Sequence, residues 1–104
     1  ESLRSDVAAT LRDAGLVLVD RALDRGELDL ARWAADHALM VAPEDELLMC
    51  ARIRTEHAAG NRPGVERHVL RLTQQARALG VDLMPQTVLL CQQVMEGRAR
   101  PRRA

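Results

Sequence analysis

The chain has 104 residues, of which fifteen are acidic and fifteen are arginine, and it contains no lysine; Trp33 is its only aromatic residue. This length favours one domain, and a hydrophobic share of 47% excludes a wholly disordered chain. A net charge of zero argues against a nucleic-acid-binding domain, and the scarcity of aromatic rings removes stacking platforms for single strands. No apolar run approaches the ~18 residues of a membrane span and no signal peptide opens the chain, so we expect a cytoplasmic protein.

Apolar residues at helical spacing predict a first helix over residues 5–24, which ends at Gly26, a residue suited to a left-handed cap. Its stripe comprises Val7, Leu11, Leu18 and Ala22, widened by Leu16, Val19 and Leu23. A second helix is predicted over residues 28–42, and Pro43 ends it. One narrow face of this helix carries small residues: Ala31, Ala35, Ala38 and Ala42.

The acidic residues at 44–46 suit the first turn of a third helix, which runs to about Ala59 and stops at Gly60. Asn61 can cap a fourth helix that has Pro63 in its first turn and ends at Gly80. This fourth helix has the cleanest apolar period, through Val65, Val69, Leu72, Ala76 and Leu79. An extended link over residues 81–84 then leads to Pro85 and a fifth helix over about 86–96.

No segment alternates apolar and polar residues as a half-buried strand would, so the sequence predicts an all-α domain over residues 1–97. Residues 98–104 form a basic tail that we expect to be disordered. Gly26 and Gly60 lie 34 residues apart, and each ends one helix and opens the next. Because 34 residues is the period of a tetratricopeptide helix pair, we expect a tetratricopeptide-like stack of antiparallel helical hairpins with about five helices.

The second half of the chain carries several motifs in a fixed order. A helix begins at Pro43-Glu44-Asp45-Glu46, and a turn follows at Ala59-Gly60-Asn61-Arg62. An arginine-containing helix then leads to Leu79-Gly80-Val81-Asp82 and to Pro85-Gln86-Thr87. Over roughly residues 20–95 this order resembles the bacterial transcriptional activator domain, the tetratricopeptide-like module of SARP-type regulators in actinobacteria. The last motif departs from the family pattern, since one proline is missing and Gln86 replaces the usual glutamate.

The resemblance implies a protein–protein interaction module of an actinobacterial transcriptional regulator. In such regulators a winged helix-turn-helix domain binds DNA, and none fits in this chain, so we expect no direct nucleic-acid contact from this domain. The implied partner is another protein or a neighbouring domain, with a homodimer as an alternative. The departures from the motif leave a second interpretation open, in which the module serves a non-transcriptional signalling or cell-envelope assembly.

Residues suited to catalysis or metal binding are sparse. The three histidines, His37, His57 and His68, are spaced so that no two share a helical turn, and no nucleophile or phosphate-loop motif occurs. Cys50 and Cys91 lie 41 residues apart within apolar stretches, which favours two buried thiols over a metal site and leaves a disulfide open. We therefore predict no enzyme activity, no cofactor and no metal.

Trp33, His37 and Met40 share one face of the second predicted helix, flanked by Leu30. Trp33 packs either in the core or in a partner-binding groove with Met40, because tryptophan is enriched at binding hot spots and methionine at adaptable surfaces. Arg67 and Arg71 on the fourth helix belong either to a solvated face or to a patch for an acidic partner. These six residues are the predicted partner-binding set.

The zero net charge is a cancellation between two opposed halves. Residues 1–46 hold eleven acidic and five basic side chains, whereas residues 47–104 hold four acidic and ten basic ones. This asymmetry predicts one acidic and one basic end, suited to head-to-tail contact between copies or to a charge-matched neighbouring domain.

Overall fold

The computed structural model describes residues 2–97, all of whose regular structure is helical. The five helices are α1 (Ser2–Asp24), α2 (Leu28–Val41), α3 (Glu46–Ala58), α4 (Arg62–Leu79) and α5 (Pro85–Glu96). The all-α prediction is confirmed, and the predicted helix boundaries hold to within a few residues. The predicted disordered tail, residues 98–104, lies outside the described residues.

Side-chain caps and left-handed glycines set several of the helix ends. The Asp45 carboxylate accepts a hydrogen bond from the Leu48 N–H at the start of α3, and Asn61 accepts one from the Gly64 N–H at the start of α4. Gly80 ends α4 with a φ of 68°, a left-handed conformation that glycine adopts without steric penalty. The predicted caps of α4, Asn61 and Gly80, are therefore both confirmed.

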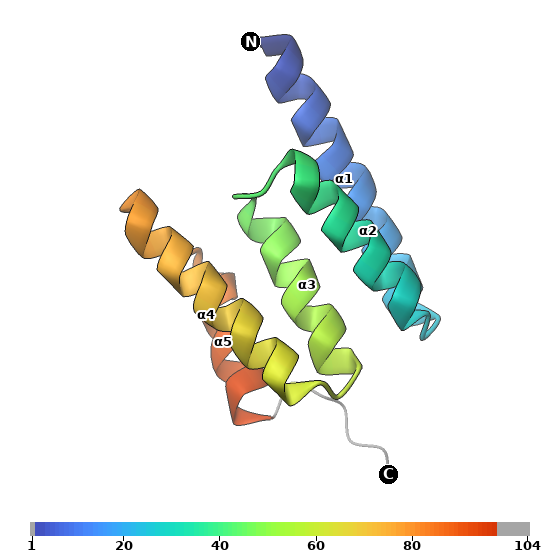
Figure 1. The fold of residues 1–104 in the computed structure, drawn as a ribbon, viewed down its shortest axis with the longest axis vertical. Coiled ribbons are helices and arrows are strands. Elements are labelled where there is room, and N and C mark those ends of the chain that lie inside the picture. The colour runs from blue at the N-terminus through green and yellow to red at the C-terminus, as the bar shows by residue number, and fades with distance from the viewer. Residues whose placement is uncertain (1, 98–104) are drawn as a thin grey trace.

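The helices stack as antiparallel neighbours, and α3 lies in the middle (Figure 1). α1 packs along α2, α3 packs against α1, α2, α4 and α5, and α5 lies behind α4 in the view of Figure 1. The molecule measures 49 × 31 × 20 Å, and its smallest dimension equals about two helix diameters of roughly 10 Å. The fold is therefore a two-layer slab in which α3 contacts every other helix.

The core has two parts that differ in side-chain size. Between α1, α2 and α3 it consists mainly of small residues: Val19, Ala22, Ala31, Ala34, Ala35 and Ala51. Between α3, α4 and α5 it is built from larger side chains: Met49, Ile53, Val65, Leu72 and Val94. The alanines allow α1 and α2 to approach closely, as at Gly15 and Ala38.

The N-terminal half of α1 projects beyond the rest of the slab (Figure 1). Gly15 packs on Ala38, near the end of α2, and Arg12 binds Asp45 in the loop after α2. The part of α1 that precedes Arg12 therefore extends past the end of α2 and does not pack along it. Val7 and Leu11, which the apolar period places on the core-facing stripe, are 48% and 40% exposed. Periodicity shows which residues share a face but not where the partner helix ends.

Replacing Gly15 with alanine is expected to destabilise the α1–α2 contact. A Cβ atom at this position would lie 2.8 Å from the Cβ of Ala38, which has no rotatable bond with which to move away. The strain should exceed the helix-propensity gain of about 1 kcal/mol, giving a net loss of about 1–2 kcal/mol in the free energy of unfolding. Urea denaturation followed by circular dichroism measures this loss.

The paired variant Gly15→Ala/Ala38→Gly is the control, because it moves the methyl group from one helix to the other. The second substitution should be less destabilising in the Gly15→Ala background than in the wild-type chain. Strict additivity of the two effects would contradict the contact.

Candidate functional site

A buried carboxylate, Glu56 of α3, is the centre of an ion-pair network. Its side chain is 2% exposed. Arg32 of α2 binds it with both ends of the guanidinium, from Nε to Oε2 at 2.7 Å and from Nη2 to Oε1 at 3.1 Å. Arg52, one turn earlier on α3, donates to the same carboxylate, and the Asn61 side-chain amide donates to Oε1 at 2.8 Å. The network therefore joins α2, α3 and the start of α4.

The surroundings of Glu56 strongly favour its ionised form. Hydrogen bonds from Arg32, opposed by burial and aided by Arg52 and Asn61, lower the pKa of Glu56 from 4.5 to about 2. Arg52 also donates from Nε to Asp36 Oδ1 of α2 at 2.7 Å, so its guanidinium bridges two carboxylates. Because each buried charge has a partner, the network fixes α2 against α3 without an isolated buried ion.

An open cleft lies beside this network, between α2 and α4, with α3 as its floor. Across residues 2–97, no α-carbon of α2 comes within 8 Å of one in α4. The cleft has a volume of about 340 Å³. Its lining combines apolar and charged side chains: Asp36, Leu39, Met40, Pro43, Met49, Arg52, His68 and Arg71. It offers a partner apolar side chains from α2, the following loop and α3, and positive charge from Arg71 of α4.

His68 of α4 lies in the wall of this cleft. Burial lowers the pKa of His68, and the positive charges of Arg52 and Arg67 lower it further against the opposing effects of Glu56 and Asp36. At neutral pH the imidazole is therefore uncharged, and the positive charge of the cleft comes from its arginines.

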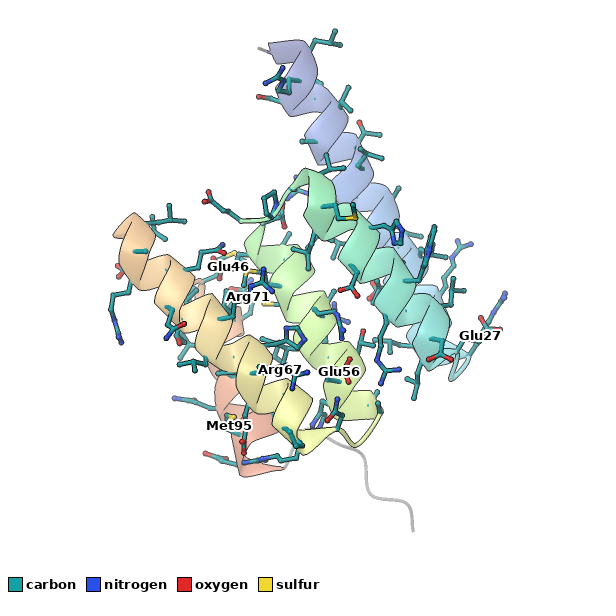
Figure 2. All side chains as sticks on the ribbon, in the orientation of Figure 1. Glu27, Glu46, Glu56, Arg67, Arg71 and Met95 are labelled. Atoms are coloured by element: carbon teal, nitrogen blue, oxygen red, sulfur yellow. The ribbon has the colours of Figure 1, made fainter. Side chains whose placement is uncertain are left out.

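The structure places the predicted partner-binding residues on both sides of the cleft. Met40 and Arg71 line it from α2 and α4 respectively, and Figure 2 shows Arg67 and Arg71 extending from α4 toward the side of α3 that carries Glu56. Leu30, Trp33 and His37 lie on the outer surface of α2, next to the cleft rather than in it. Of the six predicted residues, the cleft lining therefore includes two, Met40 and Arg71.

Trp33 is 54% exposed, so of the two alternatives for this residue the core is wrong. Its ring stacks on His37 with the centroids 4.3 Å apart, and the two side chains cover the outer face of α2. The His37 Nδ1 lies 2.8 Å from the Trp33 carbonyl oxygen, which fixes the imidazole in this position. The core-facing side of α2 is filled instead by its alanines.

Sequence reasoning missed the central members of the site: Glu56, Asp36 and His68. The i, i+4 spacing of Arg52 and Glu56 on one helix could have indicated their ion pair. The pair between Arg32 and Glu56 spans 24 residues and has no such local signal. Only the packing of α2 on α3 brings those two side chains together. Two arginines of α3 also form such long-range pairs: Arg52 binds Asp36, and Arg54 binds Asp20.

A second groove lies between α1 and α5 on the other side of α3. Its lining includes Leu16, Leu47, Met84 and Cys50, and Cys50 Sγ lies 3.3 Å from Thr87 Oγ1. Both cysteines are free, and burial raises the pKa of Cys50 and of Cys91, which disfavours thiolate chemistry. The disulfide left open by the sequence is therefore not formed in this structure.

Within residues 2–97, no three histidine, cysteine or acidic side chains are grouped so that they could hold a metal ion. None of the helices in this range combines the length and apolar character needed to cross a membrane. Neither a protein-family model, nor a curated protein, nor a solved structure matches the chain.

The exposure of Trp33 leads to a stability prediction. We expect Trp33→Ala to lower the free energy of unfolding by less than about 1 kcal/mol, because the ring packs on one neighbour and fills no cavity. Urea denaturation followed by circular dichroism measures the change. Ile53→Ala, at a fully buried position, should in contrast cost about 2–5 kcal/mol. A loss at Trp33 comparable to that at Ile53 would contradict the exposed position.

Proposed function

We propose that this domain is a non-catalytic protein–protein interaction module that holds its partner on the α2–α4 side. The observation that carries the proposal is the open cleft between α2 and α4, bordered by exposed Trp33, Met40 and Arg71 over a floor held by ion pairs. Exposed aromatic, methionine and arginine side chains over a rigid floor are typical of protein-binding surfaces.

The tetratricopeptide-like interpretation belongs to this proposal. Two antiparallel hairpins, α1–α2 and α3–α4, turn at Gly26 and Gly60, both of which have positive φ. The 34-residue interval between these glycines supports a repeat of one structural unit. α5 then stands where the first helix of a third hairpin would lie.

We place the module in an actinobacterial transcriptional regulator whose DNA-binding part is another domain. The motif order from Pro43 to Thr87 supports this placement. Five arginines of residues 2–97 make their ion pairs and hydrogen bonds within the domain: Arg12, Arg32, Arg52, Arg54 and Arg62. The proposed partner is a protein or a neighbouring domain in the cytoplasm, with a homodimer as one form.

The alternative function is a scaffold module in a non-transcriptional signalling or cell-envelope assembly. It would use the same cleft, since nothing in the chemistry of the cleft is specific to transcription. The departure at Gln86 from the activator-domain pattern is the observation that favours it. Only the identity of the partner separates the two functions.

Site-specific photo-crosslinking inside the native host tests the proposal. A benzophenone amino acid is placed at position 33 of the full-length protein, on the outer face of α2, and in a control variant at position 17. Val17 is 52% exposed on α1, so the two positions are matched in exposure. We expect a protein adduct at position 33 that is absent at position 17.

The identity of the adduct decides between the functions. A component of transcription or of a DNA-binding domain supports the regulator, and a cell-envelope or signalling-assembly protein supports the alternative. Equal adducts at both positions, or none at position 33, would overturn an interaction surface on α2.

A further inference from the structure

We infer, on the basis of the proposed function, that the α2–α4 cleft binds an acidic protein segment, which inserts large apolar side chains onto Met40 and Met49 and places carboxylates on Arg71 and the neighbouring Arg67. Three features of the described residues carry this inference: the shape of the cleft, the placement of its apolar side chains, and the arginines that have no internal carboxylate.

The volume of the cleft sets the size of what enters it. A group the size of a water molecule occupies about 30 Å³, so 340 Å³ accommodates about eleven such groups. This is room for the side chains of one or two large apolar residues. The partner segment therefore lies across the mouth of the cleft and inserts only its anchors.

The apolar part of the lining comes from α2, the loop after it and α3. Leu39 and Met40 contribute from α2, Pro43 from the loop after it, and Met49 from the floor on α3. Met40 is 77% exposed, whereas Met49 is 6% exposed. A partner side chain that reached Met49 would at the same time cover Met40, the apolar side chain of α2 with the highest exposed fraction.

The cationic part of the lining is divided between paired and unpaired arginines. Arg52, on the floor, is neutralised by Asp36 and Glu56. Arg71 is the lining arginine of α4, and Arg67, one turn before it, lies beside the cleft near His68. Neither forms an ion pair with a carboxylate in residues 2–97, and Glu44, exposed near Pro43, does not reach either of them. Two guanidinium groups over an apolar cleft complement carboxylates that flank an apolar anchor.

The ion-pair network keeps the cleft open before a partner arrives. Arg32, Arg52 and Glu56 fix α2 to α3, and the Asn61 side chain, bonded to both Glu56 and the Gly64 N–H, fixes the start of α4. Because the walls are positioned by bonds within the domain, binding requires little reorganisation of the backbone.

The test uses synthetic peptides and the methyl resonances of the four methionines. The probe is an amphipathic peptide of about fourteen residues with two leucines one helical turn apart and glutamates around them. A second peptide has lysine in place of every glutamate. We expect the acidic peptide to shift the methyl resonances of Met40 and Met49, which line the cleft, and the lysine peptide to shift neither.

The other two methionines are internal controls. Met84 lines the groove between α1 and α5, and Met95 lies on α5 near its C-terminal end (Figure 2). Their resonances should not move. A shift at Met84 without one at Met49 would show that the peptide binds in the other groove. If none of the four methyl resonances shifted, the cleft would not be a site for acidic segments. Either result would overturn the inference.

Charge reversal tests the role of the arginines. Arg67→Glu/Arg71→Glu should weaken binding of the acidic peptide about tenfold or more, and high salt should weaken binding to the wild-type chain by screening the same charges. Arg77→Glu, a reversal in the last turn of the same helix, should change the affinity less than about twofold. Equal weakening by Arg77→Glu, or equal binding of the two peptides, would show that Arg67 and Arg71 do not recognise carboxylates.

The outcomes also separate this inference from the function on which it depends. Crosslinking at position 33 without binding of the acidic peptide would overturn the partner chemistry and leave the interaction module in place. Peptide binding that shifts Met40 and Met49, with no crosslinked partner in the cell, would support the chemistry of the cleft while contradicting the proposed function.

Discussion

Glu56→Gln is expected to lower the free energy of unfolding by about 3 kcal/mol, the largest effect of any conservative substitution at the site. In the wild-type chain the Glu56 carboxylate accepts hydrogen bonds from the guanidinium groups of Arg32 and Arg52. The glutamine amide would instead place N–H donors against these donors. Removing one partner of a buried ion pair costs about 3–5 kcal/mol, and Arg32 can recover part of this by turning toward water. Urea denaturation at neutral pH measures the loss.

Glu66→Gln is the matched control, since it makes the same chemical change in an exposed pair. Glu66 binds Arg62 at 3.0 Å across one turn of α4, and both side chains are about half exposed. Its loss should stay below about 0.5 kcal/mol. If Glu56→Gln and Glu66→Gln had similar small effects, Glu56 would be solvated and would not join α2 to α3.

The helices of this fold could be predicted from the sequence because each is marked locally. The caps at Asp45 and Asn61 and the glycines at 26, 60 and 80 lie within a few residues of the ends that they define. The overhang of α1 could not be predicted in this way. Its apolar period continues through Val7 and Leu11, and only the end of α2 at Val41 determines that they face water.

The candidate site was only partly predictable for the same reason. Trp33, Met40 and Arg71 stand out by residue type and helical spacing, and the structure brings Met40 and Arg71 to one cleft. Glu56 carries no such mark, because an acidic residue inside a helix usually faces solvent. Its burial follows from the contact between α2 and α3, which joins residues far apart in the chain.

In the folded chain, some of the opposed charges of the two halves pair with each other. Arg52 and Arg54, from the basic half, pair with Asp36 and Asp20, from the acidic half. Part of the asymmetry therefore holds the halves of one molecule together. Arg67 and Arg71, on the side of α4 that borders the cleft, have no such internal partner, so a charge-matched partner has its best-defined target there.

The stability of the chain should fall in acid, and Glu56 is expected to account for a defined part of this loss. Its pKa is about 2 in the folded state and 4.5 ordinarily, so the folded state holds fewer protons between these values. The contribution of Glu56 is therefore complete above about pH 5 and is lost as the pH falls from 4.5 toward 2. The difference between these two pKa values corresponds to about 3 kcal/mol in the free energy of unfolding.

His68 also makes the stability of the chain fall with decreasing pH, but in a higher pH range than Glu56. Burial and the neighbouring arginines lower its pKa below the ordinary 6.5, so the folded state disfavours the imidazolium. Its contribution to stability is complete above pH 6.5 and decreases as the pH falls below that value. His68→Gln should remove this first decrease and leave the one near pH 4 unchanged.

The measurement compares wild-type and Glu56→Gln unfolding in urea from pH 7 down to pH 3. Because protonated glutamate and glutamine are nearly isosteric, the two curves should approach each other in acid. Their separation should decrease from about 3 kcal/mol at neutral pH to about 1 kcal/mol at pH 3. A separation that stays constant over this range would show that the lost stability comes from packing and not from the charge of Glu56, because packing of an uncharged group does not depend on pH.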